Sequence, residues 1–184
     1  MTRKEDYLRF INQFKKIVEA NGKRMIGWEE IGQAQLDSND IAQVWKNPKY
    51  AMMAAENGAG IVMSPSKKVY LDMKYDSTTK LGLKWAAYIE IKDSYDWDPA
   101  SIVDGLDEKK ILGIEAPLWG ETILTMKDIE YLLFPRLPGI AELGWSQVTG
   151  RNWDQYKGRL GYHAKRMNAM GINYYRSPQI EWKK

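Results

Sequence analysis

The pattern of apolar and polar residues predicts helices that alternate with short buried strands. Residues 5–20 repeat apolar side chains at three- and four-residue spacing, which is typical of an amphipathic helix. Four short apolar runs predict buried strands: Lys23–Trp28, Ile41–Trp45, Gly60–Ser64 and Ile111–Leu118. Further helices are predicted over Pro48–Glu56, over Met126–Trp145 with a bend or break at Pro135 and Pro138, and from an N-cap at Asn152 to Gly171.

This order of elements predicts an α/β fold with parallel strands, because buried strands that alternate with helices are joined by crossovers. Three of the four strands run into a Trp, and functional groups at the carboxyl ends of parallel strands are the rule in α/β barrels. Four strands are half of the eight that close such a barrel. We therefore expect residues 1–184 to form a single partial domain, with the irregular region 65–110 as a long functional loop.

Composition and charge exclude several classes of protein. The 184 residues carry 27 basic and 24 acidic side chains, and a net charge of 27 − 24 = +3 is too small and dispersed to indicate nucleic-acid binding. No stretch is long and apolar enough for a membrane span, and the N-terminal residues lack a signal-peptide core. The absence of Cys excludes disulfides and thiolate metal sites, and we expect neither a metal nor a cofactor. The sequence does not identify the compartment. We expect a bacterial protein that is either cytoplasmic or secreted as part of a longer protein.

The stretch Ile111–Thr122 carries the first candidate chemistry. It begins as a buried strand, and Pro117, which has no N–H to donate, ends the pairing. Trp119 and Glu121 then stand two residues apart, which places both on one face of an extended segment. An indole beside a carboxylate suits the C–H faces and hydroxyls of a sugar. The alternative is a buried Trp next to a solvated Glu. The high content of Trp (8) and Tyr (11) against Phe (3) favours contact with amphipathic ligands but is compatible with core filling.

Several motifs together resemble one family. The sequence is similar to the C-terminal half of the catalytic (β/α)8 barrel of β-N-acetylhexosaminidases of glycoside hydrolase family 20. The similar stretches, in order, are GKRMIGWEEI, the strand ending at Trp45, IVMSPSKKVYLDMKYD, LGLKWAAYIE, DSYDWDP, ILGIEAPLWGETI and IEYLLFPRLPGIAELGWS. The resemblance implies an enzyme that removes terminal β-linked N-acetylglucosamine or N-acetylgalactosamine by a retaining, substrate-assisted mechanism.

The resemblance also implies roles for individual residues. Three indoles would enclose the N-acetyl methyl group: Trp28, Trp45 and Trp119. The hydroxyl of Tyr70 would bond the acetamido oxygen as it attacks the anomeric carbon. The carboxylates of Asp72 and Glu121 would bind sugar hydroxyls, and Trp85 would line the site near the leaving sugar.

One part of the family pattern is missing from this sequence. The family places an adjacent Asp-Glu pair, the Glu being the general acid, in a His-x-Gly-Gly-Asp-Glu setting. The pairs Asp107-Glu108 and Glu29-Glu30 lack that setting, and the single histidine, His163, lies in the last helix. We expect the acid pair, and the arginine that binds sugar hydroxyls, to lie upstream of Met1.

Structural or solvent-exposed roles, rather than catalytic ones, are expected for the other conspicuous residues. Glu29 and Glu30 are interpreted as a solvated helix start, Glu115 as a hydrogen-bonding group at a strand end, and Trp97 and Trp145 as packing residues. Three hypotheses follow: part of an enzyme that is inactive alone, a non-catalytic N-acetylhexosamine-binding half-site, or a self-associating structural half-barrel. The expected partners are glycans containing N-acetylhexosamine, and either a second copy or the missing half-barrel.

Overall fold

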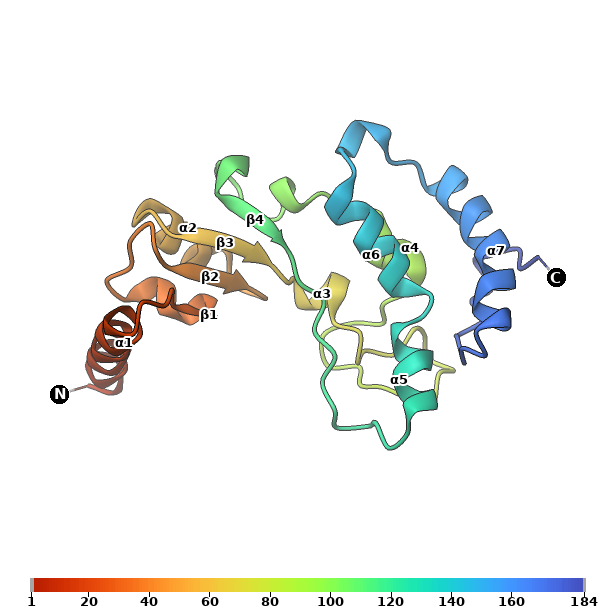
Figure 1. Ribbon diagram of the computed structural model, residues 1–184, viewed down its shortest axis with the longest axis horizontal. Coiled ribbons are helices and arrows are strands. Elements are labelled where there is room, and N and C mark those ends of the chain that lie inside the picture. Colours follow the sequence, from red (N-terminus) through yellow and green to blue (C-terminus); the bar gives the residue numbers. More distant parts are fainter. Residues whose placement is uncertain (1, 184) are drawn as a thin grey trace. The chain divides into compact units, whose positions relative to one another are not determined.

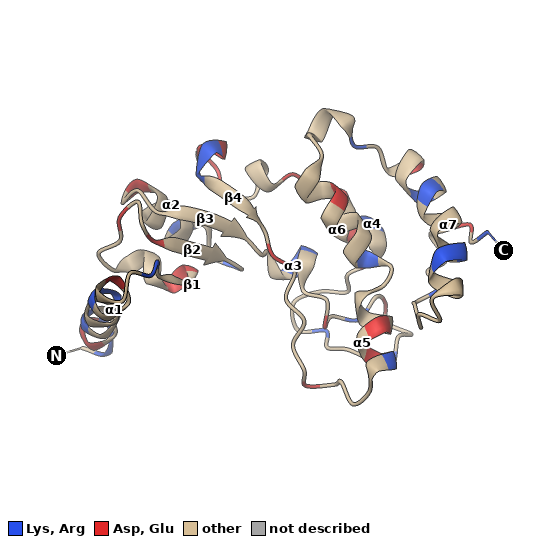
Figure 2. Cartoon of the chain, in the orientation of Figure 1, with Lys and Arg blue, Asp and Glu red and all other residues tan. Residues whose placement is uncertain are grey.

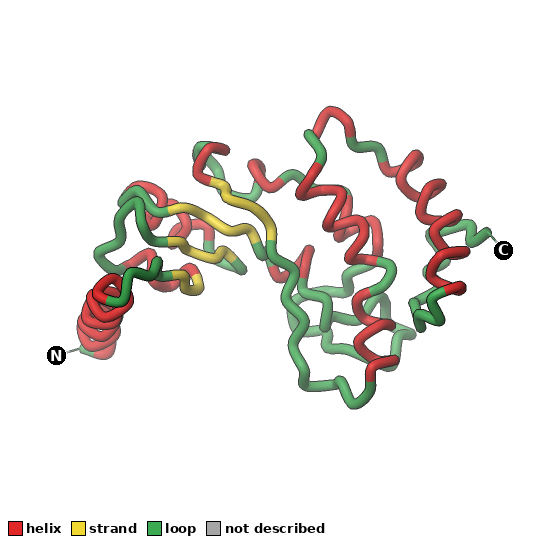
Figure 3. Tube along the Cα trace, viewed as in Figure 1, coloured by secondary structure: helices red, strands yellow, loops and turns green. Residues whose placement is uncertain are grey.

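The computed structural model describes residues 2–183, which form two compact units (Figure 1). Unit 1 contains residues 2–65 and 99–115, and unit 2 contains residues 66–98 and 116–183. All four strands belong to unit 1, whereas unit 2 consists of helices joined by long loops (Figure 3).

The sheet of unit 1 is parallel throughout, as the alternation of strands and helices predicts. Its strands are β1 (Ile26–Trp28), β2 (Ile41–Val44), β3 (Gly60–Met63) and β4 (Ile111–Ile114), and they lie side by side in sequence order. Ile41 pairs with Ile26 on one side and with Gly60 on the other. A bulge interrupts the register between β3 and β4 near Ile61. Among the described residues, β1 and β4 are therefore the two edges of the sheet.

Two α-helices flank this sheet. Helix α1 (Arg3–Ala20) begins with a capping box between Thr2 and Glu5, and α2 (Pro48–Glu56) begins at Asn47, whose side chain accepts from the backbone N–H of Lys49. Helix α2 packs against β2, β3 and the short 3₁₀ helix η1 (Glu29–Gln33). A Cβ on Gly32 would stand 2.2 Å from the carbonyl oxygen of Tyr50, so this close approach of η1 to α2 requires glycine.

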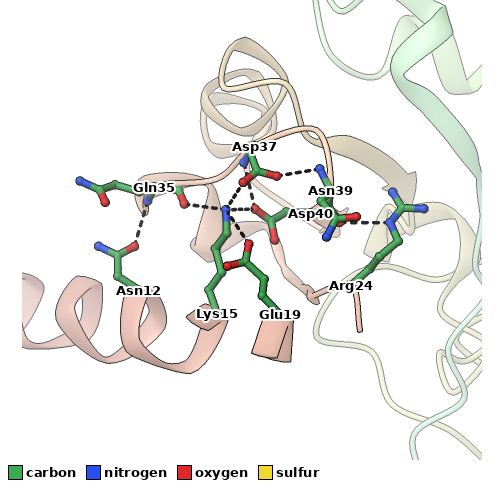
Figure 4. A network of polar contacts seen from close by, with 8 residues as sticks. All are labelled: Asn12, Lys15, Glu19, Arg24, Gln35, Asp37, Asn39 and Asp40. Carbon is green, nitrogen blue, oxygen red and sulfur yellow. Dashed lines mark hydrogen bonds and ion pairs between the residues drawn. The ribbon is translucent and has the colours of Figure 1, made fainter. Parts of the chain in front are cut away.

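Lys15 fastens α1 to the loop that precedes β2 (Figure 4). Its ammonium donates to the carboxylates of Asp37 and Asp40, at 2.6 and 2.7 Å, and to the carbonyl oxygen of Gln35 at 3.2 Å. Asn12, one turn earlier on the helix, accepts from the backbone N–H of Gln35. Helix α1 is thus held through polar contacts on the face that carries Asn12 and Lys15.

Unit 2 contains the remaining helices: α3 (Ser66–Val69), α4 (Ile91–Tyr95), α5 (Met126–Leu133), α6 (Arg136–Trp145) and α7 (Trp153–Ala169). Its core includes the stacked rings of Tyr95 and Tyr156, 4.2 Å apart, together with Ile91, Leu160 and Ile180. Helix α7 approaches the C-terminal segment closely, because a Cβ on Gly161 would stand 2.4 Å from the carbonyl oxygen of Glu181. Asn152 caps α7 as predicted, accepting from the N–H of Gln155.

The observed elements differ from the predicted ones mainly in length. The strands are shorter than the apolar runs, and the predicted helix over 126–145 is two helices separated at Pro135, with Pro138 inside the first turns of α6. Region 65–110 is mostly loop but contains α3, α4 and the 3₁₀ helices η2 (Pro99–Ser101) and η3 (Glu108–Lys110). Strands β2 and β3 contain no charged residues, whereas α1 and α7 carry both basic and acidic side chains (Figure 2).

Candidate functional site

The carboxyl ends of the strands in unit 1 carry two of the predicted indoles. Trp28 is the last residue of β1, and Trp45 directly follows β2. The register pairs Trp28 with Gln43, two positions before Trp45, so both indoles belong to the same end of the sheet. Both side chains are partly buried.

Two carboxylates that follow Trp28 hold Trp45 in place, which corrects the expectation that Glu29 and Glu30 are a solvated helix start. Glu29 is only 1% exposed, and its carboxylate accepts from the backbone N–H groups of Trp45 (2.8 Å), Lys46 (3.0 Å) and Asn47 (2.5 Å). Glu30 accepts from the indole N–H of Trp45 at 3.2 Å. Adjacent acidic residues at a helix start are usually exposed, so the sequence pattern gave no sign of these long-range bonds.

A polar link crosses the same end of the sheet. The side-chain amide of Gln43 donates to the hydroxyl of Ser64 and to the carboxylate of Glu115, each at 2.9 Å, and the Ser64 hydroxyl donates to the carbonyl oxygen of Glu115 at 2.8 Å. These bonds join β2, β3 and β4 where the strands end. The predicted structural role of Glu115 is therefore confirmed.

Unit 2 brings together three of the predicted aromatic residues. The ring of Tyr70 is buried; it lies edge-on to Trp85, with centroids 5.9 Å apart, and tilted against Trp119 at 6.3 Å. The backbone N–H of Leu71 donates to the carbonyl oxygen of Pro117 at 2.8 Å, which holds the segment of Tyr70 beside that of Trp119. Trp85 and Trp119 are both exposed. The cluster therefore offers aromatic surface around a buried tyrosine.

Asp72 lies next to this cluster and is 1% exposed. Burial raises the pKa of Asp72, and the nearby charge of Glu121 raises it further. The backbone N–H groups of Asp72 and Trp119 and the charge of Arg136 act in the opposite direction, but burial dominates. Among the described residues, no hydrogen bond within normal limits of distance and angle reaches either carboxylate oxygen. Buried acceptors of this kind are suited to ligand hydroxyls.

Arg136, which the sequence did not single out, supports this region from behind. Its guanidinium is fully buried and donates to the carbonyl oxygens of Leu71 (2.5 Å), Met73 (2.9 Å), Ile89 (3.2 Å) and Leu132 (2.8 Å). The backbone on both sides of Asp72 is therefore fixed by one side chain. Nothing in the local sequence distinguishes this arginine from a surface residue, since its partners are distant carbonyl groups.

Tyr75 completes the support. Its ring lies 4.0 Å from the Arg136 guanidinium, and its hydroxyl lies 2.9 to 3.2 Å from the carbonyl oxygens of Tyr131, Leu132 and Phe134. Burial raises the pKa of Tyr75 to about 12, so the hydroxyl stays a neutral donor. The loop carrying Asp72 is thus held by a cation–π contact and by hydrogen bonds to the end of α5.

Two other tryptophans behave differently from each other. Trp97 is buried and donates to the carbonyl oxygen of Ser94, as expected for a packing residue. The same expectation for Trp145 is wrong, because this side chain is 93% exposed. Trp145 is the last residue of α6, where the helix leaves its packed partners. His163 lies on α7 and is partly buried, and α7 contains none of the residues of the aromatic cluster.

The arrangement suits a polyhydroxylated ligand with an apolar part. Aromatic faces, a buried tyrosine and carboxylate acceptors are the groups that sugar-binding sites combine. Among residues 2–183, no group of three or more His, Cys, Asp or Glu side chains could hold a metal ion, and no helix is long and apolar enough to cross a membrane.

Comparison with known proteins decides the family. Residues 2–148 match the family described as "Glycosyl hydrolase family 20, catalytic domain". The chain belongs to glycoside hydrolase family 20. A β-N-acetylhexosaminidase from Cellulomonas fimi is 37% identical over 181 residues, which cover 97% of this chain and 36% of that protein.

Solved structures of family 20 enzymes share the fold. The β-N-acetylhexosaminidase of Streptomyces coelicolor A3(2) aligns with a TM-score of 0.94 and 42% identity, over 99% of this chain and 38% of that one. A mutant β-hexosaminidase of Streptomyces plicatus, solved with the product GlcNAc, aligns with a TM-score of 0.93 and 42% identity over the same shares. This family 20 chain therefore spans little more than a third of the length of these relatives.

Proposed function

We propose that this chain is the C-terminal part of a β-N-acetylhexosaminidase and binds the terminal β-linked N-acetylglucosamine or N-acetylgalactosamine of a glycan. The observation that carries the proposal is the cluster in unit 2, where Tyr70 contacts both Trp85 and Trp119 beside the buried carboxylate of Asp72. Family membership and the relatives' printed activity support the same substrate class.

The chemistry follows the retaining, substrate-assisted course. The acetamido oxygen of the sugar attacks its own anomeric carbon, and the Tyr70 hydroxyl donates a hydrogen bond to that oxygen. The carboxylate of Asp72 is buried, and burial raises its pKa. Its oxygens and those of Glu121 bind the sugar hydroxyls. In unit 2, Trp119 contacts the acetamido methyl group and Trp85 contacts the leaving sugar. For Trp28 and Trp45 of unit 1, the family resemblance supports contact with an acetamido methyl group.

Hydrolysis itself requires groups beyond this chain. The first residue of each acidic pair already has other partners: Glu29 accepts three backbone N–H groups, and Asp107 accepts from the N–H of Lys109 at the start of η3. We infer that neither serves as the proton donor to a leaving group. General acid catalysis contributes roughly 10²–10⁴-fold, so the chain alone should show no turnover of a chromogenic N-acetylglucosaminide above background.

The part that completes the barrel is, in this proposal, a further set of parallel strands that pair with the sheet of unit 1. Both edge strands of unit 1 expose apolar side chains, Ile26 on β1 and Leu112 on β4. Exposed edges favour pairing with another strand. We infer that these edges are covered by the remaining half of a family 20 barrel or by a second copy of this chain.

Sugar binding by the 184-residue chain tests the proposal. Saturation-transfer NMR should show contact with the acetamido methyl of N-acetylglucosamine and a weaker response to glucose. Trp119→Ala and Tyr70→Phe should reduce the N-acetylglucosamine signal, whereas Trp145→Ala, which removes an indole that is 93% exposed, should leave it unchanged. Equal responses to both sugars in all variants would contradict the proposal. The alternative hypothesis, a non-catalytic N-acetylhexosamine-binding half-site, also predicts specific binding without hydrolysis. It differs from the proposal only because it requires no second half-barrel.

A further inference from the structure

The two carboxylates after Trp28 are arranged to control the indole of Trp45. Glu29 and Glu30 open η1 directly after β1, yet both hydrogen-bond to the segment that leaves β2, 15 to 18 residues away. Their partners are the backbone and the side chain of the same residue, Trp45, and its two successors. One short turn after the first indole therefore fixes the second.

Glu29 fixes the backbone. Its oxygen Oε2 accepts from the N–H groups of Trp45 and Lys46, and Oε1 accepts from that of Asn47, the N-cap of α2. Three charge-assisted bonds and the positive end of α2 account for a carboxylate with 1% exposure. Both oxygens therefore take part, one with two donors and the other with the third.

Glu30 fixes the rotation of the ring. Its oxygen Oε1 accepts from the single indole N–H of Trp45 at 3.2 Å, and the ammonium of Lys46 lies 5.5 Å from the ring centroid. An indole has one donor, at its edge, so a bond to it sets which way the ring plane faces. With its backbone held by Glu29, the ring has little freedom left.

We propose that Glu29 and Glu30 are positioning residues that orient Trp45 to contact the acetamido methyl group, and so set the preference for N-acetylated sugars. This inference rests on the proposed function. Neither carboxylate is a catalytic residue, since each acts through Trp45. The sequence pattern GWEEI thus combines one indole with the support of the next.

The two positions should respond differently to the same substitution. In Glu30→Gln the amide oxygen still accepts from the indole N–H, whereas Glu30→Met has similar length and no acceptor. In Glu29→Gln one oxygen becomes an NH2 group that faces backbone N–H donors. Glu108→Met, at an exposed position of η3, is the matched control.

The experiment combines NMR of the indole N–H groups with sugar binding, using the full chain. Trp45→Phe assigns the Trp45 resonance among the eight indoles. Glu30→Met should shift that resonance and weaken N-acetylglucosamine binding about tenfold, the effect of one lost charge-assisted bond, without changing the response to glucose. Glu29→Gln should do the same, whereas Glu30→Gln and Glu108→Met should match the parent.

The outcomes separate the two proposals. A Trp45 resonance that is unmoved in Glu30→Met overturns the positioning role, whatever happens to the sugar. A resonance that moves while N-acetylglucosamine binding is unchanged overturns the link to sugar preference. If the unmodified chain binds neither sugar, the proposed function fails, and the indole resonance still decides whether Glu30 orients the ring.

Discussion

The side-chain ammonium of Lys15 lies 2.7 Å from the carboxylate of Asp40, which is itself 1% exposed (Figure 4). This pair joins α1 to the residue that precedes β2, and Asp37 adds a second carboxylate at 2.6 Å. The backbone of Asp40 also takes part, since its carbonyl oxygen accepts from the N–H of Gly60 at the start of β3. Lys15 therefore ties α1 to the sheet, together with the bond between Asn12 and the backbone of Gln35.

Removing Lys15 should be costly because it leaves the Asp40 carboxylate buried without its cation. Lys15→Met is expected to lower the free energy of unfolding by about 3 kcal/mol, the usual effect of breaking a buried ion pair from one side. Adding Asp40→Asn should recover part of the loss. Urea unfolding of the two single variants and the double variant measures the coupling. Additive losses would show that Lys15 and Asp40 stabilise the fold independently.

The same network predicts how stability changes with pH. Hydrogen bonding to Lys15 lowers the pKa of Asp37 below 3.8, so the stabilising contribution is present above that value and is lost as the pH falls through the lower folded pKa. Burial lowers the pKa of Lys15, but the hydrogen bonds and charges of Asp37 and Asp40 together raise it above 10.5, so the contribution of Lys15 is lost as the pH rises through the folded pKa. Urea midpoints of the parent should fall at both extremes. The fall should be smaller in Lys15→Met, and parallel curves would contradict this account.

Arg136→Lys should destabilise unit 2 although the charge is kept. A lysine ammonium cannot reproduce the planar fork that serves four carbonyl oxygens or the contact with the Tyr75 ring. We expect a loss of at least about 3 kcal/mol, since each buried carbonyl left unpaired costs roughly 1–3 kcal/mol. Arg159→Lys is the control: Arg159 pairs with Glu142 at the surface, where a loss below about 1 kcal/mol is expected. Similar thermal shifts in both variants would contradict a supporting role for Arg136.

Asp72→Asn should stabilise the chain while weakening sugar binding. Burial raises the pKa of Asp72, so its charged form is disfavoured in the folded state; a neutral amide should gain about 1 kcal/mol at neutral pH. Because the folded pKa lies above 3.8, protonation stabilises the fold, and the advantage of Asn should shrink as the pH falls through that raised pKa. Urea unfolding near neutral pH and in acid, with N-acetylglucosamine titration, measures both effects. Lower stability together with weaker binding would assign Asp72 a structural role instead.

The sequence predicted the fold where periodic patterns and family motifs act locally. Parallel strands and the bounds of α2 (Pro48–Glu56) follow from the apolar runs, Pro48 and Asn57-Gly58. The same approach identified Tyr70, Trp85 and Trp119, which the structure places in contact.

Long-range polar contacts were beyond that approach. Arg136 is buried because carbonyl groups 47 to 65 residues away converge on it, together with the carbonyl group of Leu132 near the end of α5. Glu29 is buried for the same kind of reason. No local pattern encodes such partners, and the rule that charged residues lie at the surface points the wrong way at both positions. Trp145 shows the converse, since a large apolar residue at a helix end is exposed.

The free sheet edges predict that the isolated chain self-associates. All strands of unit 1 are parallel and lie in sequence order, so a two-fold axis along the strands would bring β4 of one copy beside β1 of the other, in parallel, at both junctions. Such pairing would close eight strands. It would also cover Ile26 and Leu112, which are 53% and 54% exposed on the two edges.

Light scattering behind a sizing column should therefore give about twice the 21.3 kDa of one chain at micromolar concentration. Ile26→Lys together with Leu112→Lys places a charge on each edge and should shift the chain to monomer, because inward or edge lysines oppose strand pairing. Val148→Lys changes an apolar residue of similar exposure that lies outside the sheet, and it should leave the mass unchanged. A monomeric parent would show that the edges are covered within one chain. A dimer that survives both edge substitutions would place its interface on another surface.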